Sequence, residues 1–435
     1  MNLSELKKRR RQLMASMGEG GIAILPAAQE HIRNRDVYHD YRQDSDFLYL
    51  TGFEEPESVA VLVPGRPQGE YILFCRERNP EKETWDGLRA GQEGAVERYG
   101  ADDAFPITDI DDILPGLMEN RERVYYTMGR NPAFDKHMMD WLNRVRSSAR
   151  KGVRAPGEFI DLDHQLHEYR LFKSRSEVSA MRRAAKVSAA AHKRAMAACQ
   201  PGMNEFEIEA ELLYEFRRNG MTTAYPSIVG GGRNGCILHY IDNRDALRDG
   251  DLLLIDAGAE NQGYASDITR TFPVNGEFSP AQREVYEIVL EAQLAAIEKT
   301  LAGNHWDDPH QAALRVLVRG LIDLGLLKGS VQSVLESGEY RRFYMHRTGH
   351  WLGMDVHDVG DYKVDEDWRL LEAGMVTTVE PGLYITAADD IPERFHNIGI
   401  RIEDDVLVTK EGYDVLSKDA PKDIDTIESL VGSGV

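Results

Sequence analysis

LLLIDAG, residues 252–258, is an apolar segment that closes on the carboxylate of Asp256. An apolar run of this length, followed by Ala257-Gly258, predicts a buried strand that ends at the aspartate. An ionised carboxylate is very costly to bury without a partner, so Asp256 either lies at a solvated strand end or is held by a cation. Taken alone, the segment favours the solvated strand end.

The returning segment, residues 264–272, carries a second carboxylate at Asp267. Side chains alternate between the two faces of a strand, so Asp267, Thr269 and Thr271 should share one face. Asp267 should then be a hairpin neighbour of Asp256. Two adjacent carboxylates repel each other unless one stays protonated or divalent cations bind both, and the pair alone leaves both possibilities open.

Two further segments carry carboxylates at strand positions. The apolar segment 375–379 is followed by Glu380, and the alternating segment 397–404 places three isoleucines on one face and Arg401 with Glu403 on the other. By itself, the pair of Arg401 and Glu403 is best explained as an ion pair on the surface of a sheet. Together with the two aspartates, however, Glu380 and Glu403 make four carboxylates on strands.

Three of the 13 histidines, His346, His350 and His357, fall within residues 345–357. Such clustering is typical of a functional site rather than of isolated structural histidines. One imidazole with four carboxylates suits Mn²⁺, Co²⁺, Fe²⁺ or Zn²⁺ and can bridge two ions, with Mn²⁺ as the first choice. A water that bridges two such ions becomes hydroxide near neutral pH and attacks a carbonyl, so the set predicts a metal-dependent amide hydrolase.

The order and spacing of these residues resemble the metallopeptidase family of aminopeptidase P and prolidase. The matching segments are LIDAG (254–258), DITRTF (267–272), HWLG (350–353), VEPG (379–382) and GIRIED (399–404). Residues 41–53 resemble the family's N-terminal domain and distinguish the chain from the methionine aminopeptidases. The resemblance implies an α/β (α+β) fold, with an N-terminal mixed α/β domain at residues 1–172 and a C-terminal pita-bread catalytic domain at residues 173–435.

The resemblance also implies a role for each site residue. Two divalent ions would be held by Asp256, Asp267, His350, Glu380 and Glu403, with Asp267 and Glu403 bridging. Glu380 would in addition orient the hydroxide and pass its proton to the leaving imino nitrogen. Substrate would be bound and the tetrahedral intermediate stabilised by His239, His346, His357 and Arg401, with Trp85 reaching the site from the N-terminal domain. A partly covered surface residue is the alternative for Trp85, and Tyr384 is interpreted as a packing residue.

The implied activity is that of an Xaa-Pro aminopeptidase, which removes one N-terminal residue from peptides that have proline second. Prolidase activity on Xaa-Pro dipeptides is the alternative. A non-catalytic binding protein on the same scaffold would be expected to lack ligands, whereas all five are present here. The resemblance further implies a homodimer or homotetramer.

Arg347 departs from the family pattern His-Gly-x-x-His, in which a small residue follows the first histidine. Its side chain either narrows the substrate site or points outward.

The length of 435 residues predicts two domains. In the first third, β-rich runs at 22–25, 58–63, 71–75 and 124–127 alternate with helical stretches, which predicts an α/β domain. The second domain should begin near Phe172, because Ser174 and Glu177 form a capping-box pattern ahead of a helix that extends to Ala198. The same signals predict helices from Asn204 to Asn219 and after Ser279.

The net charge of −21, from 52 basic and 73 acidic residues, opposes binding to nucleic acid or to an anionic membrane surface. We interpret the basic run at residues 7–11 as the solvated face of a helix. The N-terminus lacks the apolar stretch of a signal peptide, and the widely spaced Cys75, Cys199 and Cys236 suit reduced thiols. These features predict a cytoplasmic protein that does not span a membrane.

Overall fold

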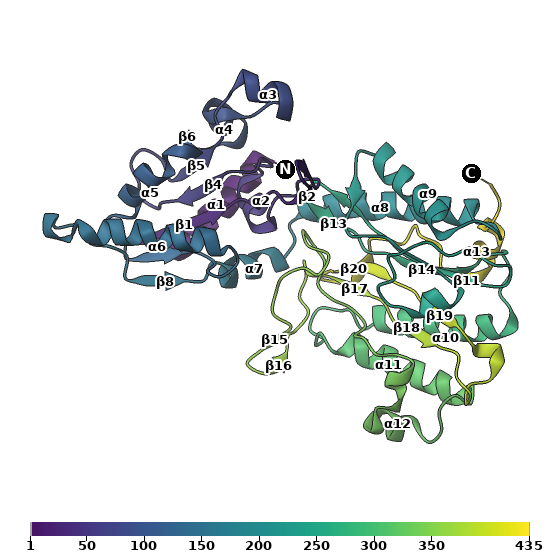
Figure 1. Cartoon of the computed structure of the whole chain (residues 1–435). Helices are drawn as coiled ribbons and strands as arrows, with labels where there is room; N and C mark the ends of the chain where they lie inside the picture. Colours follow the sequence, from purple (N-terminus) through teal and green to yellow (C-terminus); the bar gives the residue numbers. More distant parts are fainter. Residues whose placement is uncertain (1, 435) are drawn as a thin grey trace. The chain divides into compact units, whose positions relative to one another are not determined.

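The computed structural model describes residues 2–434 and divides into two compact units, Met1–Tyr169 and Arg170–Val435 (Figure 1). No helix within residues 2–434 is both long enough and apolar enough to cross a membrane.

The N-terminal unit is built on a six-stranded sheet. Its strand order is β6-β5-β4-β1-β7-β8, and β4 is antiparallel to both of its neighbours whereas the other pairs are parallel. These strands are β1 (Gly21–Pro26), β4 (Val59–Leu62), β5 (Tyr71–Cys75), β6 (Asp103–Pro106), β7 (Arg123–Tyr125) and β8 (Glu158–Ile160). Strands β4 and β5 are buried along their whole length, which explains why they read as continuous apolar runs rather than as alternating ones.

Seven α-helices and a short hairpin accompany this sheet in the described residues. The helices are α1 (Leu3–Met17), α2 (Ser45–Thr51), α3 (Pro80–Asp86), α4 (Gly91–Tyr99), α5 (Ile110–Met118), α6 (Pro132–Ser147) and α7 (Asp163–Leu171). The hairpin consists of β2 (Ile32–Asn34) and β3 (Val37–Tyr38).

The prediction of a solvated basic face at residues 7–11 is wrong for two of its members. Arg9 and Arg10 are buried, and each donates through Nη1 to a carbonyl at the end of α2, to Tyr49 O at 3.0 Å and to Leu50 O at 2.7 Å. The last carbonyls of a helix have no partner within it and carry partial negative charge, so they attract guanidinium groups. The two arginines therefore join α1 to α2.

The C-terminal unit places most of its strands between two groups of helices (Figure 1). The helices are α8 (Arg175–Ala198), α9 (Glu205–Arg218), α10 (Pro280–Ile297), α11 (Asp308–Asp323), α12 (Val331–Ser337) and α13 (Ile424–Leu430). Reciprocal capping boxes at Ser174 and Ser279 begin α8 and α10, as the sequence predicts. One continuous apolar core joins α8 and α9 to β11 and to α10 and α11.

Several short sheets make up the middle layer of this unit. β10 (Ile228–Gly231), β11 (Leu252–Asp256) and β14 (Thr269–Pro273) form one sheet, and β17 (Val376–Val379), β20 (Asp404–Val408) and β21 (Tyr413–Val415) form another. Strand β18 (Gly382–Ile385) pairs with β19 (Ile398–Arg401). The remaining strands are β9 (Thr222–Thr223), β12 (Ala259–Asn261), β13 (Tyr264–Ala265), β15 (Lys363–Val364) and β16 (Asp367–Trp368).

Two segments predicted as single strands are interrupted at a carboxylate. Residues 397–404 divide into β19 and β20, and residues 264–272 divide into β13 and β14, so that Glu403 and Asp267 fall in the breaks. At the first break the chain changes partners, because Ile402 N donates to Pro381 O at 3.3 Å and Glu403 N donates to Thr269 O at 3.1 Å. Each interruption takes its carboxylate out of a regular strand at the point where the sheets meet.

Candidate metal centre

Strand register brings the carboxylates together from distant parts of the chain. Asp256 at the end of β11 is opposite Thr269, the first residue of β14. Val379 is opposite Asp404, which makes Glu380 and Glu403 neighbours where β17 and β20 begin to separate. The hydrogen bond from Glu403 N to Thr269 O then joins the two sheets.

His350 reaches the same place along the edge of β17. Its backbone carbonyl accepts from Thr378 N at 3.0 Å, and its own backbone N–H donates to Thr378 Oγ1 at 3.0 Å. Its Nε2 lies 3.4 Å from Asp267 Oδ2 and 3.6 Å from Glu380 Oε1. The imidazole is thus directed at two of the carboxylates.

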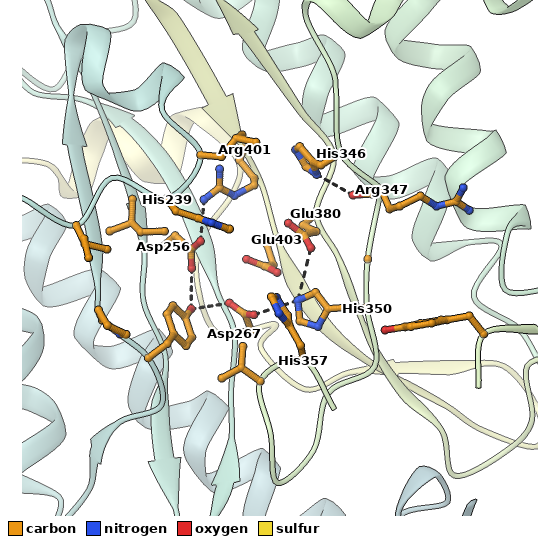
Figure 2. A pocket seen from close by; sticks show the side chains of 18 of the residues that line it. His239, Asp256, Asp267, His346, Arg347, His350, His357, Glu380, Arg401 and Glu403 are labelled. Carbon is orange, nitrogen blue, oxygen red and sulfur yellow. Dashed lines mark hydrogen bonds and ion pairs between the residues drawn. The ribbon is translucent and has the colours of Figure 1, made fainter. Parts of the chain in front are cut away.

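All five predicted ligands line one cavity of about 860 Å³ (Figure 2). Asp267, His350 and Glu403 each offer an atom within 4.8 Å of the other two. Ligand atoms that share an ion at about 2 Å lie within about 4 Å of one another, so small side-chain shifts would complete such a site.

The electrostatics of the cavity also fit divalent cations. Burial raises the pKa of Glu380 to about 7, and it also raises the pKa of Asp256. Burial together with the neighbouring carboxylates holds the pKa of Glu403 well above its usual range. Burial alone would raise the pKa of Asp267 too, but the hydrogen bond and charge of His350 outweigh it and the pKa is lowered. Four carboxylates so close together carry more negative charge than the neighbouring side chains neutralise, and their oxygens with one imidazole are a donor set that divalent metals prefer.

Tyr225 links the two aspartates and was not predicted from the sequence. Its hydroxyl lies 2.7 Å from Asp256 Oδ1 and 2.5 Å from Asp267 Oδ1. Burial and the adjacent carboxylates raise the pKa of this phenol well above its usual value, so it remains a hydrogen-bond donor. Tyr225 precedes β10 in a segment without helical or strand periodicity, so no pattern in the sequence marks it as a site residue.

Arg401 is buried at 3% exposure and holds several site residues at once. It donates to Asp256 Oδ2 at 2.7 Å, to Tyr384 Oη at 3.0 Å and to Thr269 Oγ1 at 3.1 Å. Thr269 Oγ1 in turn donates to Glu403 Oε2 at 2.6 Å. The orientations of Asp256 and Glu403 therefore both depend on one guanidinium group.

Tyr384 is a packing residue, as expected, but its hydroxyl also belongs to the site. His346 Nε2 lies 2.8 Å from Tyr384 Oη, and His346 Nδ1 lies 2.7 Å from the carbonyl of Arg347. Burial lowers the pKa of His346 to about 3, so its ring is neutral. A carbonyl can only accept, so the proton is on Nδ1 and Nε2 accepts from Tyr384, which itself accepts from Arg401.

The other predicted site residues differ in their surroundings. His239 and His357 are exposed and line the cavity, and the ring of His357 meets that of His350 edge to face at 4.3 Å. Trp85 lies in the N-terminal unit on α3 and is 85% exposed. Its role in substrate binding stays a prediction.

A buried group of three charged side chains, Asp358, Lys173 and Arg170, lies at the end of the segment that carries His350 and His357. Asp358 accepts from Lys173 Nζ at 2.9 Å and from Arg170 Nη2 at 2.6 Å, while its backbone N–H donates to Trp351 O at 2.9 Å. Burial alone would raise the pKa of Asp358, but the two cations lower it below its usual value. No pattern in the sequence predicts this pairing.

The two-unit fold and its carboxylate-rich centre define a metal-dependent hydrolase. The profile of metallopeptidase family M24 matches residues 179–410, and that of the aminopeptidase P N-terminal domain matches residues 6–125. The chain belongs to metallopeptidase family M24, which confirms the predicted fold class and the predicted kind of enzyme.

Relatives and solved structures match over nearly the whole chain. The Xaa-Pro aminopeptidase of Escherichia coli (strain K12) is 44% identical over 98% of this chain and 97% of its own length, and that of Haemophilus influenzae is 42% identical over 98% and 97%. The solved structure of Pseudomonas aeruginosa aminopeptidase PepP is 59% identical, with a TM-score of 0.98 over 99% of this chain and 98% of that chain.

Proposed function

We propose that this protein is an Xaa-Pro aminopeptidase that uses two divalent metal ions, with Mn²⁺ as the first choice. The main support for this proposal is that five potential ligands line one cavity whose negative charge is not fully neutralised. These ligands are Asp256, Asp267, His350, Glu380 and Glu403. The proline specificity rests on the two bacterial relatives, which are both Xaa-Pro aminopeptidases. A solved structure of the E. coli relative holds the inhibitor Pro-Leu, which is the fragment that cleavage of Xaa-Pro-Leu would leave.

Divalent ions held by the five ligands would polarise the scissile carbonyl and acidify the attacking water. Glu380 is suited to carry the proton in this reaction. Its carboxylate lines the cavity beside the other proposed ligands, where it would take a proton from the attacking water and return it to the leaving imino nitrogen.

The histidines of the cavity would then have separate roles. His239 and His357 are exposed to the cavity and are free to donate to the carbonyl oxygen of the substrate as it gains negative charge. His346 accepts from Tyr384 and so acts through Tyr384 and Arg401 on the position of Asp256. Trp85 would contribute to substrate binding from the N-terminal domain.

We also propose that the protein is cytoplasmic and forms a homodimer or homotetramer. Cys75, Cys199 and Cys236 are free thiols, and burial raises the pKa of each to about 12, which suits a reducing compartment and gives none of them a nucleophilic role.

The substrate class can be tested with three peptides and the Mn²⁺-loaded protein. We expect release of the first residue from Xaa-Pro-Yaa, with Xaa-Ala-Yaa as the control that lacks proline. Cleavage of the dipeptide Xaa-Pro without cleavage of Xaa-Pro-Yaa would instead identify a prolidase. Equal cleavage of Xaa-Ala-Yaa and Xaa-Pro-Yaa would contradict proline specificity.

A further inference from the structure

Arg347, the residue that departs from the family pattern, lies in the wall of the cavity. Its side chain extends away from the carboxylates, on the side of His346 and His350 (Figure 2). The guanidinium carbon lies 5.1 Å from the ring centroid of Trp306 and 4.7 Å from that of Trp368. The side chain therefore lines the site at some distance from the metal ligands rather than blocking them.

Aromatic rings fix the position of this arginine. Trp306 packs against Tyr362 at 4.4 Å and against Trp368 at 5.5 Å, and Tyr362 stacks on the fully buried Trp351. Trp306, Tyr362 and Trp368 all line the cavity beside Arg347. Because a planar guanidinium binds to aromatic rings through its face, its N–H groups remain directed outward along its edges.

Arg347 retains hydrogen-bonding capacity. Within residues 2–434, its recorded acceptor is Asp307, which it contacts through Nη2, and its side chain is 42% exposed. A guanidinium has five N–H donors, so Nε and Nη1 can serve a further acceptor. Arg401, the other cation in the cavity wall, is buried and already bound to Asp256.

The chemistry of the cavity indicates which part of a peptide meets Arg347. A free N-terminal ammonium would be repelled by the guanidinium. His239 lies across the carboxylates from Arg347 in Figure 2, and the apolar residues Leu238 and Ile241, which are close to it in the sequence, also line the cavity. The first residue of a substrate fits that apolar side, which directs the leaving peptide toward Arg347.

We propose that Arg347, held between Trp306 and Trp368, binds a carboxylate of the leaving peptide beyond the proline. This inference rests on the proposed Xaa-Pro aminopeptidase function. The carboxylate is either the C-terminus of a tripeptide or an acidic side chain at the third position, since a guanidinium binds both by the same pair of parallel hydrogen bonds. The site would thereby favour short or acidic peptides.

The test compares matched peptides in the Mn²⁺-loaded full chain. Xaa-Pro-Leu is compared with its C-terminal amide, and Xaa-Pro-Glu-amide with Xaa-Pro-Gln-amide. For the wild type we expect kcat/KM to be about fivefold higher for the charged member of at least one pair, mainly through KM, as for a partly exposed ion pair. The pair that shows this preference identifies the source of the carboxylate.

Arg347→Gln should reduce the ratio of kcat/KM between the charged and the uncharged member of that pair to about one. Arg347→Lys should restore part of this ratio, because lysine returns the positive charge but not the planar guanidinium. Arg341→Gln removes an exposed arginine outside the cavity and should keep the wild-type ratio. An equal loss of kcat/KM for both members of a pair in Arg347→Gln would mean that Arg347 only supports the cavity wall. This result would overturn the inference. A wild-type ratio near one in both pairs would overturn it too, whereas failure to cleave any Xaa-Pro peptide would reject the proposed function itself.

Discussion

Arg401 donates through Nη2 to Oδ2 of Asp256 at 2.7 Å, from a position that is almost fully buried. The same guanidinium donates to Tyr384 and Thr269, and Thr269 donates to Glu403. One side chain therefore orients two proposed metal ligands that come from distant parts of the chain.

Arg401→Lys tests this dependence. A lysine keeps the charge but cannot hold three acceptors in one plane, so we expect Mn²⁺ affinity to fall about 10- to 100-fold. Calorimetric titration of the metal-free protein measures the change, and Arg341→Lys, outside the cavity, is the matched control. Unchanged affinity would show that Arg401 does not orient the ligands.

Glu380→Gln tests the proposed proton carrier. The amide has nearly the shape of the carboxylate but cannot accept the proton, so we expect kcat to fall by about 10²- to 10⁴-fold. Steady-state kinetics on Xaa-Pro-Yaa measures the loss, and Glu336→Gln on the exposed face of α12 is the control. A near-normal kcat would exclude Glu380 from proton transfer.

His239→Ala separates substrate contact from metal binding. His239 lines the cavity but is not one of the five proposed metal ligands, so the variant should keep its metal content while kcat/KM falls by about 10²-fold. Metal analysis of the purified variant beside the kinetics checks both parts, with His39→Ala as an exposed control. Loss of the metal would instead make His239 part of the ligand set.

Asp358→Asn tests the buried group of Asp358, Lys173 and Arg170. At pH 7 we expect a loss of about 3–5 kcal/mol in the free energy of unfolding, because Lys173 and Arg170 would lose their buried partner. The folded-state pKa of Asp358 is lowered, so its contribution is complete above the unfolded value of about 4 and is lost as pH falls through the folded pKa. The difference in Tm between wild type and variant should therefore shrink on acidification toward pH 3. A difference that stays constant with pH, or one equal to that of the exposed control Asp361→Asn, would contradict this assignment.

Local signals in the sequence predicted much of the fold. The starts of α8 and α10 follow from Ser174 and Ser279, because a capping box involves residues only three positions apart. The strand that ends at Asp256 follows from its apolar run. Features of this kind need no knowledge of the rest of the chain.

Features that depend on distant partners were predicted less well. The interruption at Glu403 arises from a hydrogen bond to Thr269, far away in the sequence, so strict alternation in residues 397–404 could not reveal it. Arg9 and Arg10 are buried because the end of α2 lies against them, whereas a run of basic residues by itself indicates a solvated face. Tyr225 was missed because no motif or periodicity marks it.

The proposed mechanism requires that the five ligands hold two metal ions and that hydrolysis depends on them. Stepwise addition of Mn²⁺ to the metal-free protein, with bound metal and cleavage of Xaa-Pro-Yaa measured in the same samples, tests that claim. We predict that two ions bind per chain and that cleavage is absent before the first ion and complete after the second. Full cleavage with fewer than one bound ion per chain would contradict it.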